Sequence, residues 1–151
     1  MNALLIRVAL VLALVSENAC AQEVVVGNRS YALSTAEEAK LTELALAGSG
    51  EAATQISDRY YFDPTIEENP ELKKKALEWA LIGSENGAAD AQFRAFQLLS
   101  TSTDRGNQVR ALFWLKNAAT KGNRFAGPIL KECPSVDSQH NHGRPCFGPD
   151  R

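Results

Sequence analysis

The sequence lacks long apolar runs and an excess of charge of either sign. No apolar segment reaches the roughly 18–20 residues that a membrane-spanning helix needs, which excludes an integral channel or transporter. The 16 Lys and Arg residues are offset by 18 Asp and Glu residues, giving a formal charge of −2. Nucleic-acid binding usually requires a basic face. We therefore expect no nucleic-acid partner.

Histidine and cysteine are also scarce, which narrows the possible chemistry. The only histidines are His140 and His142 near the C-terminus, so a Ser-His-Asp or Cys-His site on the rest of the chain is excluded. With 44% hydrophobic and 23% charged residues, the 151-residue chain has the composition of one globular domain. We expect a protein that is not an enzyme and that uses no cofactor.

The first 21 residues are typical of a secretory signal peptide. Arg7 supplies a positive charge, residues 8–15 form an apolar segment, and Ala19-Cys20-Ala21 fits the small-x-small cleavage pattern. The apolar segment is too short to span a bilayer. We expect no stable membrane insertion once the signal is removed, and a periplasmic or secreted protein.

Cleavage is expected between Ala21 and Gln22. The alternative is a lipid anchor on Cys20, but Glu17 stands where a lipoprotein motif has an aliphatic residue. Cleavage leaves a mature chain of about 130 residues, enough for one modest core.

Two cysteines, Cys133 and Cys146, remain in the mature chain. An even pair in an exported protein predicts a disulfide, and a loop of this size contributes on the order of 3 kcal/mol. His140 and His142 lie between the two cysteines, but the paired ligand spacing of zinc sites is missing. We expect a disulfide-closed polar loop and no metal site.

The chain is predicted to be helical from Ser34 onward. Ser34 and Glu37 form a capping box, and Asn69-Pro70 is a second helix start. We expect helices over about residues 34–47, 49–62, 70–87, 88–100 and 107–121, and a shorter one ending near residue 132. The predicted regions are a signal peptide (1–21), an extended segment (22–33), a helical-repeat domain (34–132) and an irregular tail with a disulfide (133–151).

An internal repeat is the strongest signal in the sequence. The block KALEW at residues 75–79 returns as RALFW at residues 110–114, and each block is followed by a glycine and then an alanine. The repeated positions are Ala76, Trp79, Gly87 and Ala91 in one copy and Ala111, Trp114, Gly122 and Ala126 in the other. A degraded earlier copy retains Gly48 and Ala52.

The spacing of the repeat predicts antiparallel helical hairpins. The Trp fills the space between helices, the small residues allow close approach, and the glycine reverses the chain. One hairpin cannot bury its apolar face alone, so neighbouring hairpins stack. The predicted fold is all-α, a short α/α solenoid of about three helical hairpins.

The repeat resembles the Sel-one-like repeats, which are tetratricopeptide-related α/α modules. KALEW…ENGAADA and RALFW…TKGNRFA are similar to that family's basic-Ala-x-x-Trp block followed by Ala-x-x-Gly-x-x-x-Ala, and the similarity covers about residues 36–132. The family's Leu-Gly-x-x-Tyr is missing; Tyr60 and Tyr61 are its nearest counterparts in one copy, and Leu98-Leu99 in the next. The resemblance implies a scaffold or adaptor that binds proteins, often in bacterial envelopes, without catalysis.

Phe113 is the leading candidate for contact with a partner. It points about 150° away from the face that carries Ala111 and Trp114, and its counterpart in the other copy is the charged Glu78. Leu81 falls in the same sector. The alternative is that Phe113 packs against the preceding repeat. Phe113→Asp is predicted to weaken partner binding without affecting folding.

Two classes of function remain open from the sequence. The first is an exported helical-repeat protein that binds another protein, either as an adaptor in an envelope complex or as an immunity-type protein that neutralises a toxin. The second is an exported hydrolase that acts on cell-wall material with carboxylates on the concave face.

Overall fold

The protein is all-helical in the part that the structure describes. The computed structural model describes residues 31–140 and 143–149, so the predicted signal peptide, its predicted cleavage site and most of the predicted extended segment lie outside it. The helices are α1 (Thr35–Leu46), α2 (Gly50–Tyr61), α3 (Pro70–Glu85), α4 (Ala89–Ser100), α5 (Arg105–Thr120) and α6 (Ala126–Glu132). The predicted all-α class is confirmed.

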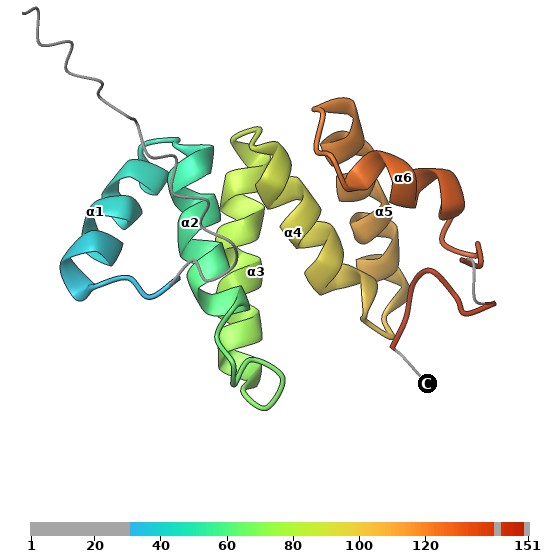
Figure 1. Cartoon of the computed structure of the whole chain (residues 1–151), viewed down its shortest axis with the longest axis horizontal. Coiled ribbons are helices and arrows are strands. Elements are labelled where there is room, and N and C mark those ends of the chain that lie inside the picture. The colour runs from blue at the N-terminus through green and yellow to red at the C-terminus, as the bar shows by residue number, and fades with distance from the viewer. Residues whose placement is uncertain (1–30, 141–142, 150–151) are drawn as a thin grey trace, which may run out of the picture.

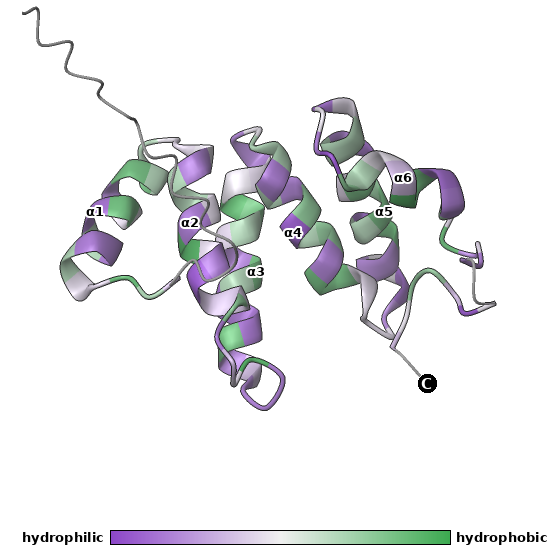
Figure 2. Ribbon diagram, in the orientation of Figure 1, coloured by the Kyte–Doolittle hydropathy of each residue, from purple (hydrophilic) through white to green (hydrophobic). Residues whose placement is uncertain are grey.

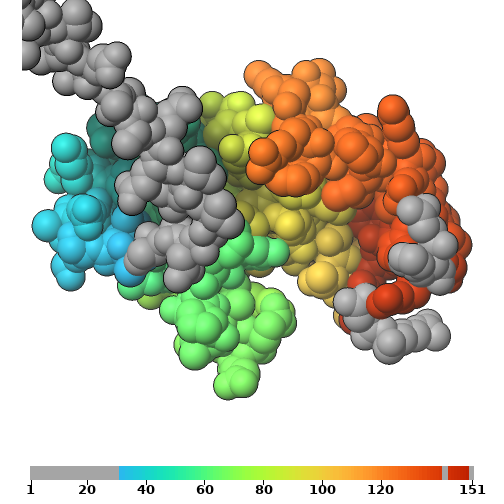
Figure 3. Space-filling model, viewed as in Figure 1, coloured from blue at the N-terminus to red at the C-terminus, as the bar shows by residue number. Residues whose placement is uncertain are grey.

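The six helices stack in chain order along the long axis of the molecule (Figure 1). Each helix packs against the next one, and α2 also contacts α4. In Figure 3, parts of the chain that follow one another in the sequence lie side by side on the surface, from blue to red. The reason is that each helix makes most of its contacts with the helices next to it in the sequence. This is the predicted short α/α solenoid of helical hairpins.

Helix starts follow the local chemistry of their capping residues. Ser34 and Glu37 form the predicted capping box at α1, and Asn69 accepts a hydrogen bond from the Glu71 amide at 3.1 Å ahead of α3. Helix α5 begins two residues earlier than the predicted residue 107. The reason is Asp104, whose carboxylate accepts from the Asn107 amide at 2.8 Å and caps the helix.

Three equivalent glycines reverse the chain within the hairpins. Gly48, Gly87 and Gly122 have φ angles of +100°, +84° and +84°, in the left-handed region that a side chain disfavours. They follow α1, α3 and α5 directly after the capping residues. The repeated glycine of the sequence is therefore the residue that ends the first helix of each hairpin.

Small residues allow helices α2, α3 and α4 to meet closely. A Cβ on Gly83 would lie 2.7 Å from the Cβ of Ala91, and a Cβ on Gly50 would lie 2.9 Å from that of Ala88. Neither glycine has room for a methyl group. These contacts explain why the repeat places small residues at fixed positions.

Most of the buried apolar residues form two clusters, one for each half of the solenoid. Figure 2 shows apolar and polar residues alternating along the helices. The N-terminal cluster is built by α1, α2 and α3 around Ile56. The C-terminal cluster is built by α4, α5, α6 and the tail around Leu115. Trp79 packs against the first cluster and Trp114 against the second, both half-buried.

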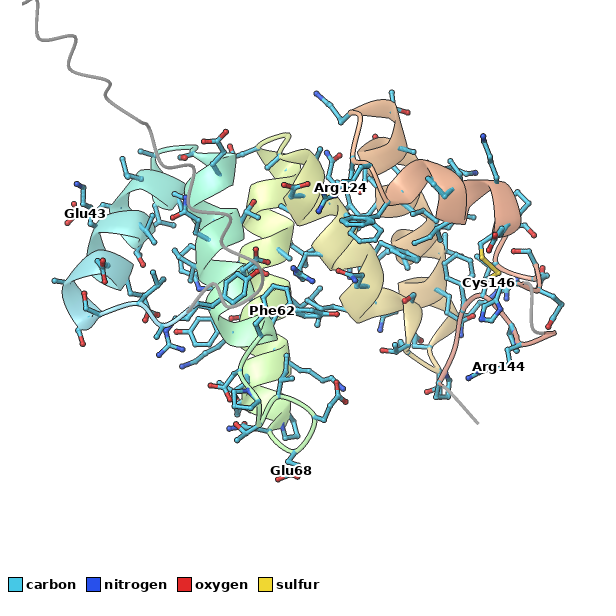
Figure 4. All side chains as sticks on the ribbon, viewed as in Figure 1. Glu43, Phe62, Glu68, Arg124, Arg144 and Cys146 are labelled. Atoms are coloured by element: carbon cyan, nitrogen blue, oxygen red, sulfur yellow. A yellow bond between two sulfur atoms is a disulfide. The ribbon has the colours of Figure 1, made fainter. Side chains whose placement is uncertain are left out.

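The tail closes the C-terminal end of the solenoid. The predicted disulfide joins Cys133 and Cys146, whose Cα atoms lie 5.8 Å apart (Figure 4). Phe147 is 4% exposed and its ring meets that of Phe96 edge-on at 6.1 Å. The amide of Gly148 donates to the carbonyl of Ser100 at 2.6 Å. The tail therefore completes the C-terminal cluster.

Among the described residues, none of the helices is both long enough and apolar enough to cross a membrane.

Candidate functional site: an aromatic groove across helix α4

A groove of about 680 Å³ runs across α4, between the end of α2 and the turn that joins α5 to α6. Five of its lining side chains are aromatic: Tyr31, Tyr61, Phe62, Phe93 and Phe125. Figure 4 shows Phe62 and Arg124 on opposite sides of α4. Recessed surfaces with aromatic walls and a few fixed polar groups are typical of binding sites. We call this feature the aromatic groove.

Arg94 of α4 is the central polar group of the aromatic groove. Its Nε and Nη2 atoms donate to the same carboxylate oxygen of Asp58, at 2.9 and 2.7 Å, and its Nη1 donates to Gln97 at 2.7 Å. The Arg94 side chain is 12% exposed and that of Asp58 is 23% exposed. Three hydrogen bonds thus hold the guanidinium in one orientation before any ligand arrives.

The guanidinium also lies against the aromatic wall that ends α2. The Arg94 Cζ atom is 3.7 Å from the ring centroid of Tyr61 and 4.6 Å from that of Phe62. These distances fall within the range of cation–π interactions, which prefer Arg. The ring of Tyr31 stacks on Phe62 with centroids 4.2 Å apart. The rings of this wall therefore contact both one another and the Arg94 guanidinium.

The opposite wall is formed by α4 and the turn between α5 and α6. Phe93 and Phe125 stack with their centroids 5.8 Å apart, and the Arg124 guanidinium lies 4.5 Å from the Phe125 ring. The side-chain Nδ2 of Asn123 donates to Asp90 at 2.7 Å, and its side-chain Oδ1 accepts from the backbone amide of Phe125 at 3.1 Å. Asn123 thereby fixes the turn against α4.

Asp58 is a groove carboxylate whose pKa is perturbed. Burial raises its pKa above the ordinary value of 3.8, against the opposing effect of the Arg94 charge and hydrogen bonds, and the nearby charge of Asp90 raises it further. Burial is the largest of these effects, and it outweighs the ion pair with Arg94. The pair orients a cation; it does not create a strongly acidic group.

The residues that the sequence suggests for contact with a partner lie outside this groove, whereas Gly122 of the repeat lines it. Phe113 is 55% exposed on α5, and Val109, one turn earlier, is 54% exposed. Glu78 is exposed and Leu81 half-buried on α3. None of Phe113, Glu78 and Leu81 lines the groove. Their contact with a partner stays a prediction for other surfaces, on α3 and α5.

The described residues contain no group of three or more His, Cys, Asp or Glu side chains placed to hold a metal ion. His140 is half-buried in the tail, and His142 lies outside the described residues. The catalytic dyad of a glycosidase would need two free carboxylates facing each other. In the aromatic groove, Asp58 is paired with Arg94 and Asp90 accepts from Asn123.

Sequence reasoning missed the aromatic groove because its residues belong to different repeats. Asp58 and Arg94 are 36 positions apart, and Phe93 and Phe125 come from α4 and from the turn before α6. The one signal in the sequence that could have indicated the groove was the presence of aromatic residues other than the two repeated Trp residues. Helix periodicity does not show that these aromatic residues face one another across α4.

In comparisons with models of protein families, with curated protein sequences and with solved structures, the chain has no match.

Proposed function

We propose that this chain is an exported helical-repeat protein that binds a segment of another protein in the aromatic groove. The observation that carries the proposal is the fixed guanidinium of Arg94, held by Asp58 and Gln97 and flanked by aromatic rings. Arg and Tyr are enriched among the residues that contribute most to protein binding. Because Arg94 is already ordered, binding costs little side-chain entropy.

The shape of the groove supports a peptide segment as the bound element. It is open along its length and crosses a helix, and its two walls come from different hairpins of the solenoid. Solenoids generally use such extended surfaces for binding. The resemblance of the repeats to Sel-one-like modules agrees with a scaffold role.

Two further features support export. The signal-like N-terminus predicts transport out of the cytoplasm, and the Cys133–Cys146 disulfide is of the kind that persists in oxidising compartments. We propose a periplasmic or secreted location. There the protein would act as an envelope adaptor or as an immunity-type protein that neutralises a toxin.

Two phenylalanines of similar exposure provide a matched test. Phe125 is 51% exposed in the aromatic groove, and Phe113 is 55% exposed on the other surface. Tagged mature protein and the variants Phe125→Asp and Phe113→Asp are used to isolate partners from a native envelope extract, with mass spectrometry of what co-purifies. Circular dichroism checks that each variant is folded.

We expect one stoichiometric partner that is lost with Phe125→Asp and retained with Phe113→Asp. The reverse result would move the binding site to the surface around Phe113. A partner retained by both variants, or no partner for folded wild-type protein, would contradict the proposal. A toxin among the partners would select the immunity role.

A further inference from the structure

Gln97 of α4 provides an oriented hydrogen-bond donor in the aromatic groove. Its Oε1 accepts from Nη1 of Arg94 at 2.7 Å. Because a guanidinium can only donate, the oxygen of the Gln97 amide must face Arg94 and the Nε2 must face away from it. Among residues 31–140 and 143–149, this Nε2 has no acceptor. Gln97 is half-buried and lines the groove, so its Nε2 can donate to a ligand.

The helix that carries this donor contacts the aromatic rings of both walls. Gln97 lies one helical turn after Phe93, whose ring stacks on that of Phe125. Its bonding partner Arg94 lies against the ring of Tyr61 at the end of α2. A ligand that reaches Gln97 is therefore in a groove whose largest apolar surfaces are aromatic rings.

The charged groups of the groove favour a ligand that accepts hydrogen bonds. Its cations are Arg94, Lys121 and Arg124, and its carboxylates are Asp58 and Asp90. Both carboxylates already accept hydrogen bonds, one from Arg94 and the other from an asparagine side chain. The groove thus has more positive than negative groups. Electrostatic complementarity favours a ligand that presents the negative ends of dipoles, such as backbone carbonyl oxygens.

The groove also restricts the backbone conformation of the ligand. Among the described residues, the one strand-like pairing is an isolated bridge between Gln139 and Pro145, and no strand lines the groove. A ligand strand would find no sheet edge with which to pair. A bound helix would use most of its carbonyls internally and leave the Gln97 donor without an acceptor. A polyproline II segment has no internal hydrogen bonds and keeps its carbonyls free.

We propose that the segment bound in the aromatic groove is proline-rich and forms a polyproline II helix, with proline rings on the aromatic rings and a backbone carbonyl that accepts from Nε2 of Gln97. This inference rests on the proposed function and specifies the partner for the same groove. Phe62 and Phe125, 44% and 51% exposed, offer apolar surface to the proline rings. Proline has no N–H, so such a segment adds few donors to a groove that is rich in them. Aromatic-lined grooves are a general means of binding this preformed helix.

The inference is tested with two labelled peptides of ten prolines each, one made of L-proline and the other of D-proline. Ten prolines span about 31 Å as a polyproline II helix. The two peptides have the same composition, rings, carbonyls and charge, and they differ only in the hand of the helix. Binding to the mature protein is measured by fluorescence anisotropy. A uniformly acidic peptide of the same length is included, because the cations of the groove could bind carboxylates instead.

We expect the L-proline peptide to bind about tenfold more tightly than the D-proline peptide, and more tightly than the acidic one. Phe125→Asp should abolish binding. Gln97→Glu keeps an oxygen for Arg94 but replaces the donor with a second oxygen, so it should weaken binding about tenfold. The matched control is Gln55→Glu, an exposed substitution on α2 that does not line the aromatic groove and should change nothing.

Equal affinity for the two proline peptides, tighter binding of the acidic one, or full affinity in Gln97→Glu would overturn the inference. If no peptide binds, a random library of peptides about ten residues long is selected on wild-type protein and on Phe125→Asp. Enrichment of proline among binders that depend on Phe125 would support the inference. Binders that depend on Phe125 without such enrichment would overturn it and leave the proposed function intact. A library without any binder that depends on Phe125 would overturn both.

Discussion

Arg94 and Asp58 join two hairpins of the solenoid through a single carboxylate oxygen. The Nε and Nη2 atoms of Arg94, on α4, both donate to Oδ1 of Asp58, on α2. The contact bridges 36 residues of sequence and lies in the floor of the aromatic groove. The same pair therefore serves the packing of α2 on α4 and the orientation of the groove's central cation.

Asp58→Ala is predicted to lower the free energy of unfolding by about 2 kcal/mol, because it leaves a largely buried guanidinium without its anion. The matched control is Glu67→Ala. Glu67 pairs with Lys73 at the same N–O distance of 2.7 Å, but its side chain is 78% exposed. An exposed pair of this kind contributes about 0–1 kcal/mol. Urea denaturation measures both, and equal losses would contradict the structural role of the Arg94–Asp58 pair.

Tyr60 is predicted to make stability sensitive to alkaline pH. Burial, a hydrogen bond to the Glu38 carboxylate and the charge of Glu38 raise its pKa above the ordinary 10.0. The folded state therefore holds this phenol proton more tightly than the unfolded chain does. The stabilisation is complete below pH 10 and is lost as the pH rises through the raised pKa.

Glu38→Gln should lower the pKa of Tyr60 toward 10.0, because it removes the carboxylate and its charge while burial remains. The measurement is a spectrophotometric titration of the phenol. Tyr31→Phe and Tyr61→Phe in the background leave Tyr60 as the only tyrosine, since the sequence has three. An unchanged pKa would show that burial alone sets the titration.

Gly83→Ala is predicted to destabilise the protein although alanine is the better helix former. The new Cβ would lie 2.7 Å from the Cβ of Ala91, and overpacking of a close core contact costs about 1–3 kcal/mol. Gly127 of α6 is the matched control, because a Cβ there meets nothing within 4 Å. Gly127→Ala should stabilise by up to about 1 kcal/mol. Thermal unfolding distinguishes the two, and stabilisation by Gly83→Ala would refute the close approach of α3 and α4.

Reduction of the disulfide is predicted to weaken the C-terminal half first. Cys133, Val136 and Phe147 belong to the cluster of α4, α5 and α6, whereas the α1–α3 cluster contains no tail residue. Loss of a crosslink across this loop costs about 3 kcal/mol. Hydrogen exchange with and without reductant should show a larger loss of protection at Leu115 than at Ile56.

The reductant control for this experiment is the double variant Cys133→Ala and Cys146→Ala, which should show the same exchange pattern in both conditions. Equal loss of protection in the two halves would mean that the clusters unfold as one unit.

Much of the fold could be predicted from the sequence because its signals are local. Two helix starts are marked by residues close together in the sequence, Ser34 with Glu37 and Asn69 with Pro70. Gly87 marks a chain reversal because glycine readily adopts a positive φ. The error at the start of α5 arose from Asp104, whose capping role depends on side-chain geometry.

The aromatic groove was not predictable in the same way. Periodicity distinguishes buried from exposed faces, and it correctly placed Ala76 and Ala111 in the core. It does not tell which exposed face is concave. Phe113 and Phe125 have nearly equal exposure, yet only the packing of the third hairpin against the second places Phe125 beside Phe93.

The C-terminal tail covers the last hairpin, and this limits where further hairpins can be added to the solenoid in evolution. A hairpin duplicated after α6 would displace Phe147 from Phe96 and expose the apolar surface that the tail now covers. A hairpin duplicated between α3 and α6 would use the same left-handed glycine turn that Gly87 and Gly122 already repeat there. Lengthening of the array is therefore expected by internal insertion, and such an insertion would move the Phe125 wall away from the Phe62 wall and dismantle the groove.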